Sequence, residues 1–158
     1  MPAPDHIEIR DVRILAGAAP AISEAAGDLI AGLTHLANPA DPAVKSLFSI
    51  HRADTDTGMS FGVSTVHGQI TAVFDHAVKN DRLVGRYRFF ALHDTPTGEP
   101  SATELWTLLF DVNHCAMWEP SDEIFSWQFA PGTYHTAQSL GEFVFRLLAK
   151  QQAALARY

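Results

Sequence analysis

The feature that most constrains this chain is a period of two in its apolar residues, which runs from about residue 43 to residue 129. Apolar side chains alternate in one short segment after another: Val44, Phe48 and Ile50; Met59, Phe61 and Val63; Ile70, Ala72 and Phe74. Such alternation is typical of strands with one buried face. The turn-forming pairs His67-Gly68 and Asn80-Asp81 separate these segments. Consecutive strands are therefore predicted to pair antiparallel, as a meander.

Two later segments are apolar on both faces. In 82–93, one face carries Tyr87, Phe89 and Ala91, and the other carries Val84, Phe90 and Leu92. The segment 105–112 is almost continuously apolar. Strands of this composition are expected to be covered on both sides. A last strand is predicted at 125–129.

The two ends of the chain follow other patterns. Residues 6–15 alternate with a shift of phase near Arg10, which predicts a first strand with a bulge. Residues 21–37 carry apolar side chains three and four positions apart after Pro20, which predicts a helix. Near the C-terminus, Ser139 and Glu142 are spaced as a capping box. The apolar stripe of this second predicted helix contains Leu140, Phe143, Val144, Leu147, Leu148, Leu155 and Tyr158.

These elements predict one α+β domain that spans residues 1–158. It contains an antiparallel meander sheet of about six or seven strands, with an N-terminal-region helix and a C-terminal helix packed on it. The composition, 47% hydrophobic and 18% charged, supplies enough apolar material for a single core.

The net charge and the N-terminal segment indicate which partners and which cellular location to expect. A net charge of −7 argues against nucleic-acid binding, which requires a surplus of Lys and Arg. We see no secretory signal and no apolar run long enough to cross a bilayer, so we expect a cytoplasmic protein without a membrane partner. The single cysteine, Cys115, cannot form an internal disulfide.

The chain has no specific catalytic or metal-binding motif. Its eight histidines lack metal-ligand spacing, and the register predicted for 69–93 places His76 nearer Gly85 than His93. The acidic segment 54–58 is similar to the start of a calcium loop, but Met59 stands where that loop needs its glycine and Thr65 where it needs its glutamate, so the segment predicts a turn. Asp111, His114 and Cys115 are interpreted as a hairpin connection with a half-buried thiol. We therefore expect no metal, no cofactor and no catalytic residue.

Two charged patches favour protein binding. Arg82, Arg86 and Arg88 recur on one strand face of an acidic chain, and a second patch contains Trp118, Glu119, Asp122 and Glu123. Arginine and tryptophan often anchor interfaces, and opposite charges steer association. The leading hypothesis is a small non-catalytic protein-binding module, comparable in kind to bacterial immunity proteins or secretion chaperones. Both patches could equally be ordinary solvated faces.

Two alternatives stay open. An aromatic-lined pocket between sheet and helix would indicate a small-molecule-binding or enzymatic domain, and its candidate residues are Phe74, His76, Tyr87, His93, Trp106 and Asp111. The same aromatic side chains could instead fill a solid core. Apolar residues on both faces of the later strands also predict a homodimer, formed through the sheet or an open edge.

Overall fold

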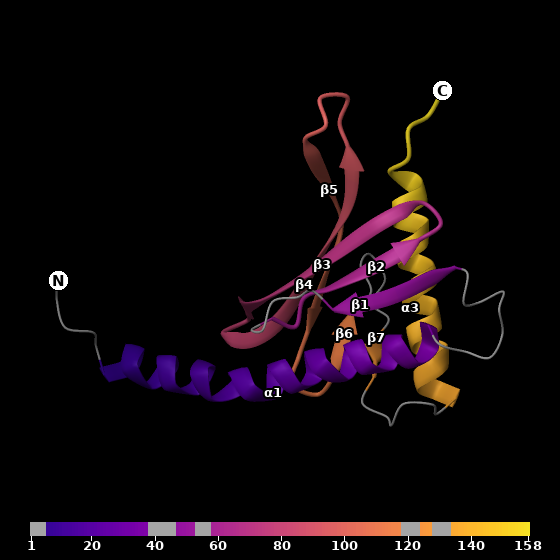
Figure 1. The fold of residues 1–158 in the computed structure, drawn as a ribbon. Coiled ribbons are helices and arrows are strands. Elements are labelled where there is room, and N and C mark those ends of the chain that lie inside the picture. The colour runs from indigo at the N-terminus through magenta and orange to yellow at the C-terminus, as the bar shows by residue number, and fades with distance from the viewer. Residues whose placement is uncertain (1–5, 38–46, 53–57, 118–123, 128–133) are drawn as a thin grey trace.

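The computed structural model describes residues 6–37, 47–52, 58–117, 124–127 and 134–158 (Figure 1). The described elements are α1 (His6–Ala37), β1 (Phe48–Arg52), β2 (Phe61–Thr65), β3 (Gly68–Lys79), β4 (Arg82–Asp94), β5 (Pro100–Phe110), β6 (Cys115–Met117), β7 (Ile124–Ser126) and α3 (Tyr134–Ala153). The strands form a seven-stranded sheet in the order of the sequence, and each strand is antiparallel to the next. The predicted α+β meander with two helices is confirmed.

The N-terminal strand predicted at 6–15 is wrong, because these residues are the first half of α1. The alternation near Arg10 is short, whereas Ile14 and Ala18 lie at four-residue steps before Ile22 and so extend the apolar stripe of the helix toward the N-terminus. Pro20, expected just inside the start of a helix, lies in the middle of α1. Its missing N–H costs the helix one backbone hydrogen bond without ending it.

The length of α1 also corrects the expectation about apolar segments. By length and composition alone, the part of α1 from Arg10 to Ala37 could cross a bilayer, with a mean hydropathy of 1.3 over its most apolar window. Only 28% of that window is buried. The buried residues are concentrated in the C-terminal half of α1, where Ile22, Leu29 and Leu33 belong to the protein core.

The predicted hairpin turns are confirmed. Gly68 has a φ of 112°, and Asn80 and Asp81 have φ values of 52° and 61°. Two consecutive left-handed residues match the twist of the strands that they connect. The resulting register pairs His76 with Gly85, as the sequence predicts. Between Phe89 and Phe90 the pairing with β5 shifts by one residue, which is a bulge.

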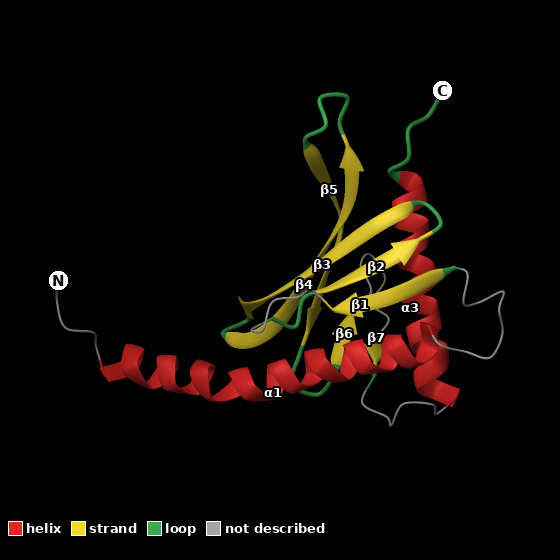
Figure 2. Ribbon diagram, in the orientation of Figure 1, coloured by secondary structure: helices red, strands yellow, loops and turns green. Residues whose placement is uncertain are grey.

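Both helices pack on one face of the sheet, here called the inner face (Figure 2). From α3, the Phe143 ring lies 5.6 Å from Phe89 and 5.5 Å from Trp106. α1 is attached to the sheet at Trp127, the residue after β7, whose Nε1 donates a 2.8 Å hydrogen bond to the Ala25 carbonyl of α1. Leu140 contacts Gly32 where the helices meet, and no side chain larger than hydrogen would fit at that glycine without a shift.

The outer face of β3, β4 and β5 is not covered by either helix. The expectation that 82–93 and 105–112 are covered on both sides is therefore wrong. Phe90 and Leu109 on this face are only half-buried, and Thr107 is exposed. A single pair of helices on the inner face cannot shield both sides of the sheet.

The C-terminal helix begins earlier than predicted. It starts at Tyr134, so Ser139 and Glu142 lie inside it and do not form a capping box. Glu142 instead accepts a 2.7 Å hydrogen bond from Arg146, one turn later. The stripe from Leu140 to Leu147 is buried as predicted, but Leu155 and Tyr158 lie beyond the helix end and are exposed.

The last predicted strand and one predicted turn fall partly outside the described residues. β7 covers Ile124–Ser126, so the predicted strand at 125–129 ends earlier than expected, with residues 128–133 outside the description. Most of the predicted turn at 54–58 lies within the range 53–57, also outside it.

Candidate binding surface

A charged cluster occupies the middle of the outer sheet face. The alternation of β3 and β4 places Asp75 opposite Arg86 and Val73 opposite Arg88, with Phe90 two residues further along β4. We call these five residues, Val73, Asp75, Arg86, Arg88 and Phe90, the outer patch. Arg86 and Arg88 share the strand face predicted for them, together with Arg82.

Asp75 holds Arg86 in a fixed geometry. Arg86 Nε donates to Asp75 Oδ1 at 2.7 Å, and a second Arg86 nitrogen donates to Oδ2 at 2.6 Å. Such a bidentate pair fixes orientation as well as charge. Arg88 is held more loosely, because its contact to the same Oδ2 is 3.4 Å long. The Arg88 guanidinium also lies 5.8 Å from the centre of the Phe90 ring, within the range of a cation–π interaction.

This network changes the ionisation of Asp75. The hydrogen bonds from Arg86 lower the pKa of Asp75 below its ordinary value of 3.8, and the charges of Arg86 and Arg88 act in the same direction. Partial burial opposes this shift and does not overcome it. The same pairing raises the pKa of Arg86. Asp75 is therefore a carboxylate throughout the neutral range.

The lowered pKa of Asp75 predicts how stability depends on pH. A carboxyl group whose pKa is lower in the folded state stabilises the fold above its unfolded pKa, and this contribution is lost as pH falls through the folded value. We expect wild type to be more stable than Asp75→Asn at pH 7. The two proteins should converge at acidic pH, below about 3.8. Urea denaturation of both proteins across this range measures the difference, and a constant gap would contradict the assignment.

Two further cations lie at the tip of the β3–β4 hairpin. Lys79 and Arg82 lie opposite each other in the register of the two strands, and both are exposed. Within the described part of the chain, neither has an ion-pair partner. The predicted acidic patch of Trp118, Glu119, Asp122 and Glu123 lies outside the described residues.

The candidate pocket residues do not all come together. Phe74 lies 5.4 Å from both His76 and Tyr87, measured between ring centres. Tyr87 is fully buried, its hydroxyl donates to the Met59 carbonyl at 2.6 Å, and burial raises its pKa. His93, in contrast, contacts Thr103 near the far end of β4, and Asp111 lies beyond the opposite end of β5. Trp106 packs against Phe143 in the core.

The interior around these aromatic rings is tightly packed. Phe61, Tyr87, Phe89 and Phe110 are at most 1% exposed, and their rings contact one another. A cavity lined by apolar side chains of α1, β1, β2 and α3, together with Thr65, has a volume of only about 10 Å³. That volume is about enough for a single water molecule. These described core residues leave little room for a ligand.

The turn from Asp111 to Cys115 is held by backbone and side-chain hydrogen bonds. Asp111 Oδ1 accepts from the backbone N–H groups of Asn113 and Cys115, at 2.9 and 3.1 Å. His114 has a φ of 61°, and its Nε2 lies 2.8 Å from Asp28 Oδ2 of α1. The half-buried Cys115 thiol lies 3.4 Å from the Asn113 carbonyl oxygen. The turn therefore ties the sheet to α1. Among the described residues, no three His, Cys, Asp or Glu side chains are grouped as a metal site.

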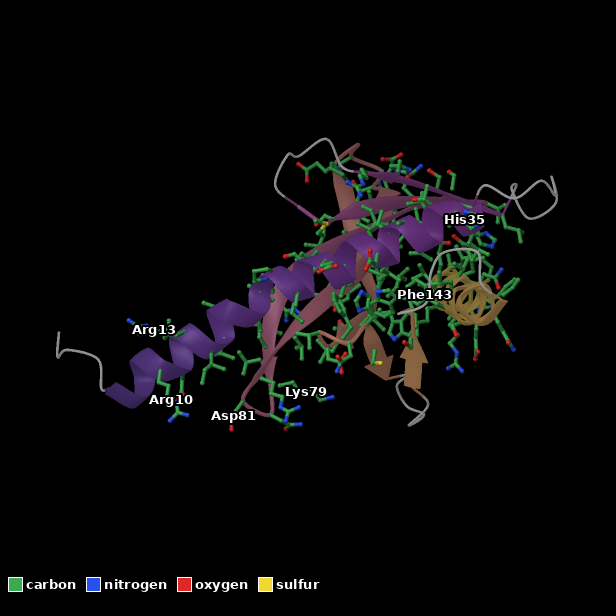
Figure 3. All side chains as sticks on the ribbon, turned by 90° about the horizontal axis from the view of Figure 1, so that it is seen from below. Arg10, Arg13, His35, Lys79, Asp81 and Phe143 are labelled. Carbon is green, nitrogen blue, oxygen red and sulfur yellow. The ribbon has the colours of Figure 1, made fainter. Side chains whose placement is uncertain are left out.

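A groove that the sequence reasoning missed lies between α1 and the tip of the β3–β4 hairpin. It has a volume of about 520 Å³. Its walls are Ile14, Leu15 and Ala18 of α1, residues Lys79 to Val84 of the hairpin, and Asp111 to Asn113 of the β5–β6 turn. Figure 3 shows Arg10 on the side of α1 that faces Lys79 and Asp81, whereas Arg13 points away. The extra length of α1, unseen in the sequence, creates this groove.

The chain matches no protein-family model, no curated protein and no solved structure. The candidate sites are therefore the outer patch and the groove, as the described residues form them.

Proposed function

We propose that this protein is a non-catalytic protein-binding module that recognises an acidic partner through the outer patch. One observation carries the proposal: a sheet face that neither helix covers presents Arg88 and Phe90 beside an Arg86 side chain that Asp75 fixes in place. Arginine and aromatic side chains are enriched at protein interfaces, where they supply much of the binding energy.

The charge of this face indicates the chemistry of the partner. The outer side of β3 and β4 carries four basic residues, Lys79, Arg82, Arg86 and Arg88. The nearby acids are Asp75, Asp81 and Glu104, and the charge of Glu104 raises the pKa of Arg86 further. The local balance is positive although the chain as a whole carries −7. An acidic partner would therefore be attracted to this face and repelled by much of the remaining surface.

The rigidity of the outer patch also supports recognition. Binding is weakened by the entropy lost when flexible side chains are ordered, so side chains that are already held lose less. Asp75 holds the Arg86 guanidinium through two short hydrogen bonds. Val73, Phe90 and Leu109 are half-buried around it and would add apolar contact. The packed aromatic interior likewise favours a binding surface over an internal active site.

Affinity isolation with a matched pair of variants tests this function. Tagged wild type, Arg88→Glu and Arg146→Glu are expressed in the native organism, and bound proteins are quantified by mass spectrometry. Arg146 is the control because its side chain is 33% exposed and paired to a carboxylate, as Arg88 is at 35%. We expect an acidic protein at equal stoichiometry with wild type and with the control. Its recovery with Arg88→Glu should fall at least about tenfold, as for an anchoring interface residue.

Two results would count against the proposal. One is equal recovery of the partner with wild type and Arg88→Glu. The other is the absence of any stoichiometric protein from the wild-type isolation. Melting curves of all three proteins show whether a loss of binding reflects unfolding, which we do not expect because Arg88 is partly exposed and its contact with Asp75 is long.

A further inference from the structure

We propose that the groove between α1 and the β3–β4 hairpin is a self-association interface whose occupant is the α1 N-terminal half of a second copy of this chain. This interface is separate from the outer patch. It rests on an uncovered helix face, an opposing apolar wall and a balanced set of charges.

The uncovered face is the continuation of the core-facing stripe of α1. In the C-terminal half of the helix, Ile22, Ala25 and Leu29 are fully buried against the sheet. Three- and four-residue steps extend the same stripe back to Ala18 and Ile14. Ile14, however, is 58% exposed, because α1 runs on past the core (Figure 1). The apolar face of α1 that packs on the core in its C-terminal half is therefore exposed to solvent at Ile14.

Such an extension needs further support to be stable. The half of α1 before Pro20 is about 20 Å long at 1.5 Å per residue. Isolated helices of this length are marginal in water, and most helices in proteins are stabilised by packing of an apolar face. Leu15 and Ala18 are only half-buried by the chain itself. A second molecule in the groove would complete the burial of this face.

The opposite wall of the groove is also partly apolar. Leu83 and Val84 of the hairpin and Val112 of the β5–β6 turn line the groove, and Val112 is exposed. The volume of about 520 Å³ leaves room for several apolar side chains between the two walls. In a two-fold dimer each α1 both lines its own groove and occupies the groove of the partner, as an isologous interface requires.

The charges around the groove favour a second copy over a partner of one sign. Among the residues that line the groove, the cations are Lys79 and Arg82, and the anions are Asp81 and Asp111. No ion pair joins any of these four side chains to another charged group in the described part of the chain. An equal number of both signs is self-complementary, because a two-fold axis brings the cations of one copy to the anions of the other. An acidic peptide or an anionic membrane would meet repulsion from half of the rim.

Sedimentation equilibrium of the full chain tests the inference without any unknown ligand. The proteins compared are wild type, Ile14→Glu and the control Val66→Glu. Val66 is 64% exposed in the β2–β3 turn and Ile14 is 58% exposed, so both changes place a charge on an exposed apolar site. Wild type should reach twice the 17.3 kDa of one chain as concentration rises. Ile14→Glu should raise the dimer dissociation constant at least about tenfold, and Val66→Glu should leave it unchanged.

A second variant distinguishes a weakened interface from misfolding of Ile14→Glu. Val112→Glu lies on the opposite wall of the groove and outside the helix, and it should weaken the dimer in the same way. The inference is overturned if wild type is a monomer at every concentration. It is also overturned if Ile14→Glu and Val112→Glu, shown by circular dichroism to be folded, dimerise as wild type does. Equal weakening by Val66→Glu would likewise place the interface elsewhere.

Discussion

Replacing Phe110 with alanine is expected to lower the free energy of unfolding by about 3 to 5 kcal/mol. Phe110 is 1% exposed at the end of β5. Its ring centre lies 5.8 Å from that of Tyr87 and 5.3 Å from that of Trp127. The ring also covers Gly85 of the neighbouring strand so closely that a Cβ at that glycine would overlap it. Alanine would lose these contacts and leave a cavity that rigid strands cannot close.

Chemical denaturation measures this effect, with Phe145→Ala as the matched control. Phe145 is 64% exposed on α3, so its truncation should change stability by less than about 0.5 kcal/mol. A loss of stability for Phe110→Ala as small as that for Phe145→Ala would mean that Phe110 does not lie in the core. An unchanged midpoint and slope for Phe110→Ala would contradict the packing of β5 against β4.

Leu147→Ala should destabilise the fold by about 2 to 5 kcal/mol. Leu147 is 2% exposed and is part of the α3 stripe that packs on the inner sheet face. It lines the small cavity between α1, β1 and α3. Truncation to alanine would enlarge this cavity and remove the contacts of the leucine side chain.

The control for this change is Leu155→Ala. Leu155 belongs to the same sequence stripe, but it lies beyond the end of α3 and is 42% exposed. Denaturation curves should separate the two variants clearly. A midpoint for Leu147→Ala as high as that of Leu155→Ala would show that this stripe does not hold α3 on the sheet.

The sheet could be predicted from the sequence because its signals are local. Alternation in 61–74 specifies which side chains face the core, and Asn80-Asp81 specifies a tight turn, so the register that pairs His76 with Gly85 follows. The placement of Arg82, Arg86 and Arg88 on one strand face follows from the same period of two.

The first residues of the two helices are harder to predict from the sequence, because they depend on the rest of the fold. Residues 6–15 fit a strand as well as a helix over a few positions, and only the continuous stripe from Ile14 to Leu33 distinguishes the two. Pro20 and the small residues before it are typical of a helix start, yet α1 passes through them. In α3, Ser139 and Glu142 have the spacing of a capping box inside a helix that had already begun.

Contacts between distant segments leave no signal in a single sequence. Asp28 and His114 are 86 residues apart and meet because α1 crosses the β5–β6 turn. The outer patch shows the same limit in part: the face of Arg86 could be predicted, but its bidentate pairing with Asp75 depends on the register of two strands. The groove depends on how far α1 extends beyond the sheet, which no local pattern specifies.

The association rate of the isolated partner with wild type and Arg88→Glu, measured at low and high salt, tests partner recognition most directly. Arg88 is preferred to Arg86 for charge reversal because a glutamate at 86 would lie directly against Asp75. We predict that Arg88→Glu slows association and flattens its dependence on salt while the melting temperature changes little, because exposed charges affect encounter more than folding. An association rate and a salt dependence equal to those of wild type would contradict recognition through the outer patch.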